Sequence, residues 1–247
     1  MKATPEEQQR LLELADLDAE LGRVDHRRKG LPEHAELAQL DERDAELRDS
    51  LATLEAEDGD LKRGQAKAES DVDQVRTRVD RDQQRLDAGQ VSTPRELENL
   101  QSEIASLGRR QSDLEEIVLD LMERRETVQA SINAGAAERA QITATRGEVL
   151  SRRDAALAEL AEQGGKAERR RAEVAAQVPA ELVAFYDKLR ASHGGVGAAA
   201  LRRGRCEGCH LGFSTVDLNT IRAAAPDEVL RCEECRRILV RTDESGL

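Results

Sequence analysis

Two long stretches of this chain repeat apolar residues every seven positions, and this periodicity favours a coiled coil of helices. The repeat runs through Leu40, Leu47, Leu54, Leu61, Ala68 and Val75, and then through Leu100, Leu107, Leu114, Leu121, Val128, Gly135, Ile142 and Val149. The companion position three residues earlier in each heptad is apolar in some repeats and polar in others. Such a narrow seam suits two helices better than a bundle.

Residues 88–93 separate the two stretches and carry the signals of a turn. Gly89 can end a helix because glycine adopts the left-handed conformation without strain. Thr93 fits the cap of the next helix, with Pro94 at the first helical position and Glu96 three residues after the cap.

Folding the chain back at this turn pairs the apolar residues of the two stretches consistently. The residue numbers add to one total in three such pairs: Leu61 with Leu121, Leu54 with Val128, and Leu40 with Ile142. An antiparallel hairpin requires this consistency, whereas a parallel dimer does not predict it. We therefore expect a mainly α fold, in which residues 1–178 form a long antiparallel coiled-coil hairpin.

Two glycine-containing segments interrupt the expected hairpin. Pro32 follows Gly30 closely in the first arm, and proline both removes a helix hydrogen bond and clashes with the preceding turn, so we expect a kink near residues 30–32. In the second arm, Gly164-Gly165 is expected opposite Leu17, where it forms either a flexible segment or a hinge.

The composition argues against one large globule. Aromatic residues make up 1% of the chain and charged residues 36%, which is typical of long helices. The formal net charge is −12, and it falls on residues 1–195, because residues 196–247 hold equal numbers of acidic and basic side chains. The hairpin should therefore repel nucleic-acid phosphates. No run of about 18 apolar residues predicts a membrane span.

Residues 179–195 are expected to connect the hairpin to a second domain. Pro179 precedes a short amphipathic stretch that holds Phe185 and Tyr186, two of the few aromatic residues. The glycine-rich segment after Ser192 reads as a linker.

The chain has four cysteines, and they form two Cys-x-x-Cys pairs: Cys206 with Cys209, and Cys232 with Cys235. Four thiolates complete a tetrahedral zinc site. Strand-like apolar segments flank both pairs, so residues 196–247 are expected to form a small β zinc ribbon around one structural Zn²⁺. A module of this size buries too little apolar surface to fold without its metal.

Other uses of these cysteines are weaker interpretations. The N-terminus lacks the apolar core of a signal peptide, so a reducing cytoplasm is expected, where disulfides are rare. Catalytic zinc needs an open coordination position, and a redox pair needs a strand-to-helix context. His210 can replace a cysteine as ligand, but four thiolates already satisfy the ion. His193 is expected to be solvated.

Arginines surround both cysteine pairs: Arg202, Arg203, Arg205, Arg231, Arg236 and Arg237. If the pairs come together, these arginines form one patch able to bind phosphates or a partner. Glu207, Glu233 and Glu234 lie in the same turns, and Phe213 is the only aromatic residue close by, so a base-stacking platform is missing. A solvated surface of mixed charge is the alternative.

These segments resemble one family, the bacterial C4-type zinc ribbon proteins with an N-terminal coiled-coil hairpin. The resemblance spans the whole chain and rests on residues 91–97, Leu100, Glu103, Ile104, the four cysteines and residues 237–239. The chain departs from the family at Arg236, where glycine is usual, and at Val240, where tyrosine is frequent. The resemblance implies zinc on the four cysteines and a non-enzymatic adaptor. Members are linked to flagellar assembly, an alternative sigma factor, RNA binding or secretion partners, depending on lineage.

Two functions of different class follow. The first is a cytoplasmic adaptor or scaffold, monomer or weak dimer, whose hairpin binds a protein and whose ribbon binds a protein or nucleic acid. The second is an RNA- or DNA-binding regulator acting through the arginine face. A transcript-cleavage factor with an acidic hairpin tip is disfavoured, because Glu96 is explained as a cap. An enzyme with a small-molecule substrate is disfavoured, because no nucleophile–base set, phosphate loop or open metal site is present.

Overall fold

The computed structural model describes residues 1–247 and confirms the mainly α fold, a helical hairpin followed by a small region of strands. The elements are α1 (Pro5–Lys29), α2 (Pro32–Asp87), α3 (Pro94–Ala175), α4 (Ala180–Ser192), β1 (Ala198–Arg202), β2 (Arg205–Cys206), α5 (Thr215–Ala223), β3 (Leu230–Arg231) and β4 (Ile238–Val240). The chain divides into two compact units. We call Glu36–Val149 the hairpin unit, and Met1–Ala35 with Leu150–Leu247 the ribbon unit. No helix is both long and apolar enough to cross a membrane.

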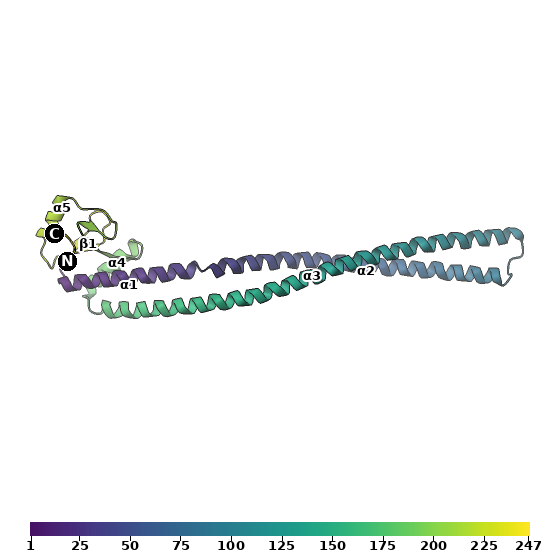
Figure 1. Ribbon diagram of the computed structural model, residues 1–247, viewed down its shortest axis with the longest axis horizontal. Helices are drawn as coiled ribbons and strands as arrows, with labels where there is room; N and C mark the ends of the chain where they lie inside the picture. Colours follow the sequence, from purple (N-terminus) through teal and green to yellow (C-terminus); the bar gives the residue numbers. More distant parts are fainter. The chain divides into compact units, whose positions relative to one another are not determined.

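In the hairpin unit, α2 and the first part of α3 lie side by side in opposite directions (Figure 1). The buried apolar residues occupy the repeat position or its companion three residues earlier: Leu37, Leu47, Leu51, Leu61, Ala68 and Val72 on α2, and Leu100, Leu114, Val128, Ile142 and Val149 on α3. Leu121 lies against Gly64, so the arms pair within about one helical turn of the predicted register.

The polar companion positions of the heptads pair across the same seam. Arg125 Nε lies 3.1 Å from Asp58 Oδ1, and Arg125 Nη1 donates to Gln65 Oε1 at 3.0 Å. Arg139 Nε donates to Asp44 Oδ1 at 2.8 Å. These partners sit opposite one another in only one alignment of the arms, so they reinforce the register that the apolar residues select.

The turn between the arms uses the capping residues that the sequence indicates. Gly89 follows α2 with a φ of 63°. Thr93 Oγ1 accepts from the Glu96 backbone N–H at 3.2 Å, and the Glu96 carboxylate accepts from the Thr93 N–H at 3.1 Å. Glu96 is therefore part of a reciprocal helix cap.

The ribbon unit packs α1, the end of α3, α4 and the strands around one core, with both chain termini close by (Figure 1). Its least exposed apolar side chains include Leu11, Leu14, Leu182, Tyr186 and Ile238. The extended N-terminus joins the ribbon directly, because the Ala3 N–H donates to the Asp227 carbonyl at 2.8 Å.

The strands form one small sheet in the order β2-β1-β4-β3. The central strands β1 and β4 run parallel, with Ala199 opposite Leu239, and the outer strands pair antiparallel to them. Residues 198–240 comprise the two parallel strands and the crossover connection between them, and both cysteine pairs lie in that connection.

The expected position of Gly164-Gly165 is wrong. A side chain at Gly164 would lie 3.6 Å from Val24, about one heptad from Leu17, and α3 is helical through both glycines. Part of this offset is already present in the hairpin unit, where Leu121 lies against Gly64, whereas the sequence pairs it with Leu61. The break between Lys29 and Pro32 adds to it, because non-helical residues rise further per residue than helical ones.

Candidate metal centre

The first cysteine pair lies in a tight loop that begins at the end of β2. The Cys206 N–H donates to the Leu211 carbonyl at 3.0 Å, and the His210 N–H donates to the Cys206 carbonyl at 2.7 Å. His210 adopts a φ of 60°, which turns the chain back after Cys209. Cys206 is buried and Cys209 is half-buried.

The second cysteine pair repeats the same hydrogen bonding between β3 and β4. The Cys232 N–H donates to the Arg237 carbonyl at 3.0 Å, and the Arg236 N–H donates to the Cys232 carbonyl at 2.9 Å. Arg236 takes a φ of 62° directly after Cys235. The two loops are therefore equivalent, and each presents two sulfur atoms from one side.

The four sulfur atoms lie within 4.8 Å of one another. The Sγ atoms of Cys206 and Cys235 are 3.8 Å apart, as are those of Cys209 and Cys232. A tetrahedral zinc ion with Zn–S bonds of about 2.3 Å places its sulfur ligands roughly 3.8 Å apart, whereas a disulfide needs about 2.05 Å. The donor set fits one structural Zn²⁺, as predicted, and exposed His210 is outside the cluster.

The protonation of these thiols shows why the site needs a cation. Burial raises the pKa of Cys206 to about 12 and also raises the pKa of Cys232. Burial acts on Cys235 in the same direction, but hydrogen bonds, first from Arg237, outweigh it and lower its pKa to about 7. The buried Cys206 and Cys232 thiols therefore resist deprotonation, and a zinc ion held by the four cysteines would compensate the thiolate charge and leave no open coordination position.

Gly208 and Arg237 fix the first loop against the sheet. A side chain at Gly208 would lie 2.9 Å from the Ala199 Cβ and 3.0 Å from the Arg237 Cδ, so only glycine fits without movement. The Arg237 guanidinium donates to the carbonyls of His193 at 2.7 Å, Val196 at 3.0 Å and Gly208 at 3.2 Å. Arg237 therefore ties the linker after α4 to the metal site.

His193 is only partly exposed, whereas the sequence-based expectation placed it in solvent. It is half-buried at the end of α4, and its Nδ1 lies 2.7 Å from the Leu189 carbonyl oxygen. The prediction failed because it treated the glycine-rich segment as a free linker, whereas Arg237 binds that segment to the ribbon.

Two more of the six arginines have partners inside the ribbon unit. Arg202 Nε forms an ion pair of 2.6 Å with Glu244 Oε2. The guanidinium of Arg231 lies over the Phe185 ring at 5.6 Å from its centre. These side chains are therefore held by intramolecular contacts.

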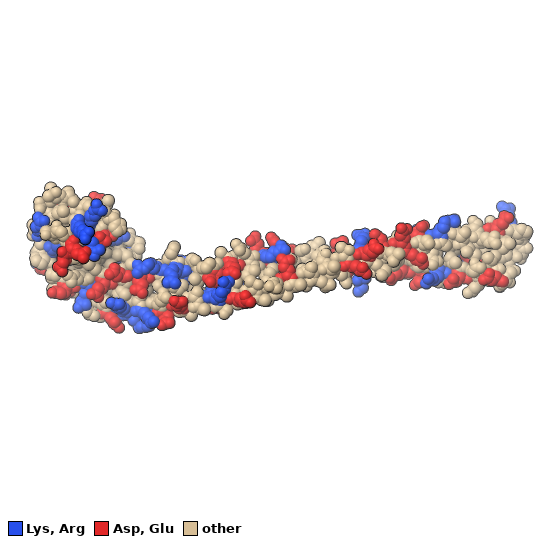
Figure 2. Space-filling view, in the orientation of Figure 1, with Lys and Arg blue, Asp and Glu red and all other residues tan.

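Arg203, Arg205 and Arg236 are exposed and form no side-chain ion pair within the chain. Three exposed acidic residues lie in the same loops: Glu207, Glu233 and Glu234. Acidic and basic side chains accordingly lie next to each other on the visible face of the ribbon (Figure 2).

A buried ionic cluster in the ribbon unit was not identified from the sequence. Asp18 of α1 accepts from Arg171 Nε of α3 at 2.7 Å and from the Tyr186 hydroxyl of α4 at 2.7 Å, and Arg190 lies 3.1 Å away. Its signal in the sequence is an acidic residue spaced four positions after Leu14, within the apolar face of α1.

The hairpin and the four-cysteine ribbon place the chain in a class of coiled-coil zinc ribbon proteins. The family model of the CT398-like coiled coil hairpin domain matches residues 14–194, and that of the C4-type zinc ribbon domain matches residues 205–239. The chain belongs to the CT398-like coiled coil hairpin family, which confirms the resemblance inferred from its sequence.

Relatives match along nearly the whole chain. The Mycobacterium tuberculosis protein Rv2229c is 38% identical over 243 residues, which cover 98% of each chain. A solved Mycobacterium smegmatis structure has a TM-score of 0.85 at 37% identity and covers 98% of this chain and 100% of its own. The structure of CT398 from Chlamydia trachomatis has a TM-score of 0.73 at 19% identity, covers 96% and 98%, and shows the shared fold.

Proposed function

We propose that this protein is a non-enzymatic cytoplasmic adaptor. Residues 1–178 form the hairpin that binds a protein partner, residues 179–195 connect it to the ribbon, and residues 196–247 form the zinc ribbon that binds a protein or nucleic acid. The chain acts as a monomer or weak dimer, because each arm of the hairpin already fills the seam of the other.

Exposed apolar side chains on the hairpin unit carry this proposal. Leu119 and Met122 of α3 are 59% and 40% exposed and lie three residues apart on one face of the helix, although the seam is filled by other residues. Grouped apolar side chains of this size on a highly charged surface are typical of sites that bind other proteins.

The metal centre supports a structural role in place of catalysis. The four sulfur ligands occupy every position of a tetrahedral ion, so no coordination position is left for water or substrate. Reduced thiols of this kind are maintained in a reducing compartment, which supports the cytoplasm.

Affinity capture tests the adaptor proposal. The full-length zinc-loaded chain and a Leu119→Glu, Met122→Glu double variant are used as baits in cells of the source organism. We expect at least one protein to be captured by the wild-type chain and lost from the variant, with unchanged helicity by circular dichroism. Identical captured proteins would contradict the hairpin as the partner-binding surface.

A second candidate is nucleic-acid binding by the ribbon, favoured by Arg203, Arg205 and Arg236. Titration with single-stranded RNA and duplex DNA across a salt series tests it. Each phosphate contact makes the plot of the logarithm of the binding constant against the logarithm of the salt concentration steeper by close to one. Binding near physiological salt that the triple alanine variant abolishes would favour this candidate. Binding that the variant retains, or none at all, would leave the protein adaptor.

A further inference from the structure

In the segment of α3 from Leu114 to Met122, apolar residues lie both in the seam and on the helix surface outside it. Leu114 is buried against α2, whereas Leu119 and Met122 are exposed on the neighbouring flank. Ile117 is also exposed, but two residues from Leu119 a helix has turned by about 200°, so Ile117 lies on the other side. One flank of the hairpin therefore carries apolar residues that no part of the chain covers.

This flank borders a groove between α2 and α3 with a volume of about 300 Å³. We call it the α2–α3 groove, and its lining residues are Glu69, Val72, Asp73, Glu115, Val118 and Leu119. Three of these residues are apolar and three are acidic, and none is basic. The groove thus combines an apolar surface with negative charge.

The acidic residues of the groove have no basic partner in the chain. Glu69 accepts from Gln65 Nε2 at 2.8 Å, and Glu115 accepts from Gln111 Nε2 at 2.8 Å, so both carboxylates bond neutral amides. Asp73 is exposed, and its side chain forms no ion pair. Three carboxylates without counter-charge raise the local negative potential.

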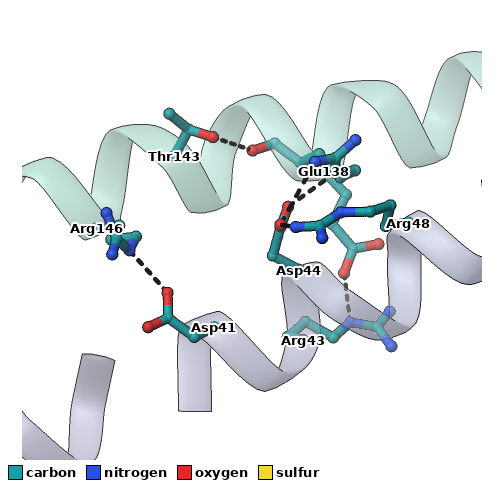
Figure 3. A network of polar contacts seen from close by, with 8 residues as sticks. Asp41, Arg43, Asp44, Arg48, Glu138, Thr143 and Arg146 are labelled. Carbon is teal, nitrogen blue, oxygen red and sulfur yellow. Dashed lines mark hydrogen bonds and ion pairs between the residues drawn. The ribbon is translucent and has the colours of Figure 1, made fainter. Parts of the chain in front are cut away.

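Several carboxylates elsewhere in the hairpin unit bind arginines. Asp44 binds Arg139 at 2.8 Å. Figure 3 shows the contact of Asp44 with Arg48 at 2.7 Å and that of Asp41 with Arg146 at 2.7 Å. The chain therefore has the means to pair its acids. The groove differs from this network in leaving its acids unpaired beside exposed apolar residues.

We propose that the α2–α3 groove binds a basic amphipathic helix of a partner protein. This proposal rests on the adaptor function and specifies its surface. Apolar side chains of the partner, spaced three and four residues apart, pack on Val72, Val118 and Leu119. Lysine or arginine residues on both flanks of that helix pair with Glu69 and Glu115. The lined segment of α3, from Glu115 to Leu119, covers about one and a half helical turns, so a partner helix of three to four turns spans it.

The charge of the groove disfavours other occupants. A second copy of this chain carries a net charge of −12, and its own groove would bring like charges together. Nucleic acid and anionic lipid surfaces are repelled for the same reason. A cationic helix is the occupant that gains from both the apolar surface and the unpaired carboxylates.

A defined peptide tests the groove directly. The probe is a fluorescent 18-residue helix with leucine on one face and lysine on the other, titrated into the full-length zinc-loaded chain. We expect saturable binding that weakens with salt, and no binding of a matched peptide with glutamate in place of lysine. Leu119→Glu should weaken binding at least about tenfold, because it removes apolar contact with the leucine face of the probe and buries a carboxylate against that face.

Ile117→Glu is the matched control, because it makes the same kind of change on the same helix but outside the groove. We expect peptide binding by this variant to equal that of the wild type. Equal losses in the two variants, or binding that Leu119→Glu leaves unchanged, would overturn the groove as the binding site. Wild-type dimers in sedimentation that Leu119→Glu dissociates would assign the groove to a second copy and overturn the proposal as well.

Capture with single variants separates this proposal from the adaptor function. The proposal expects the partner to be lost with Leu119→Glu alone and retained with Ile117→Glu. A partner that is lost only from the double variant leaves the adaptor function standing and overturns the groove. A partner set that no variant alters overturns both.

Discussion

The Tyr186 hydroxyl donates a hydrogen bond of 2.7 Å to the carboxylate of Asp18, and both side chains are removed from solvent. Asp18 belongs to α1 and Tyr186 to α4, while Arg171 of α3 donates to the same carboxylate at 2.7 Å. One buried acidic residue therefore joins three helices of the ribbon unit. A buried carboxylate is tolerated only when it is paired in this way.

We expect Asp18→Ala to destabilise the ribbon unit strongly. The change leaves Arg171 and the Tyr186 hydroxyl without their acceptor inside the core, and breaking a buried pair costs about 3–5 kcal/mol. Arg171 keeps its ion pair of 2.6 Å with Asp187, so the lower end of this range is expected. Urea denaturation followed by circular dichroism measures the loss.

Asp25→Ala is the control for this prediction. Asp25 also belongs to α1, but its ion pair with Lys29 at 2.6 Å is exposed, and exposed pairs contribute less than about 1 kcal/mol. A similar loss of unfolding free energy in the two variants would show that the Asp18 cluster contributes no more to stability than an exposed ion pair.

Tyr186 makes the folding stability of the chain depend on pH in the alkaline range. Burial, followed by the hydrogen bond to Asp18, raises the pKa of its phenol. An unfolded tyrosine ionises near pH 10, so above that pH the unfolded chain releases a proton that the folded chain retains. The contribution is present below about pH 10 and is lost as the pH rises further.

Tyr186→Phe isolates this effect. We expect the free energy of unfolding of the wild-type chain to fall more steeply than that of Tyr186→Phe between about pH 9 and about pH 11. Chemical denaturation at several pH values supplies both curves. Parallel curves would mean that Tyr186 ionises equally in the folded and unfolded chains.

The hairpin was predictable because its determinants are local. The heptad pattern and the Thr93–Glu96 cap depend on residues a few positions apart, and both appear in the structure. The partner of Gly164 was not predictable, because it depends on the offset of a few residues between the arms and on the length that the residues between Lys29 and Pro32 add to the first arm. A heptad pattern cannot supply that length.

For the metal centre, the zinc ligands were predictable from the sequence, whereas the roles of the surrounding arginines were not. Cysteine type and spacing indicate zinc without knowledge of the fold. The six arginines look alike in the sequence, yet Arg237 binds three carbonyls and Arg202 binds Glu244, whereas Arg203 is exposed. Those differences arise from backbone positions far away in the chain, which spacing does not reveal.

Removal of one zinc ligand should release the metal without unfolding the hairpin. We expect Cys232→Ser to lose stoichiometric zinc, because a buried hydroxyl does not replace a thiolate in a site closed by four sulfur atoms. Colorimetric zinc release and circular dichroism measure the two effects. His210→Ala should keep one equivalent of zinc. Retention of zinc by Cys232→Ser would exclude the four-cysteine site.

Acid titration of the carboxyl groups should detect the ion pairs of the hairpin unit through a lowered carboxyl pKa. Hydrogen bonds from Arg139 and then Arg48 lower the pKa of Asp44. Its stabilising contribution is therefore present above about pH 4 and is lost as the pH falls through the lowered value. Carboxyl NMR should give a pKa for Asp44 below the ordinary one, and Arg139→Gln should raise it.

Arg146→Gln provides the comparison for this measurement, because Arg146 binds Asp41 and not Asp44. We expect the pKa of Asp44 to stay the same in this variant. A pKa that responds equally to the loss of either arginine would show general charge screening in place of the direct hydrogen bonds drawn in Figure 3.

Arg236→Gly should stabilise the zinc ribbon. Arg236 holds a φ of 62°, a conformation that costs a residue with a side chain about 1 kcal/mol and costs glycine almost nothing. Its side chain is exposed without an ion pair, so its removal sacrifices no contact. We expect a higher Tm of the zinc-loaded ribbon and roughly fivefold tighter zinc binding in chelator competition. Arg222→Gly makes the same substitution inside α5, where glycine weakens a helix, and should lower the Tm. A drop in Tm for both variants would show that the left-handed conformation at Arg236 carries no strain.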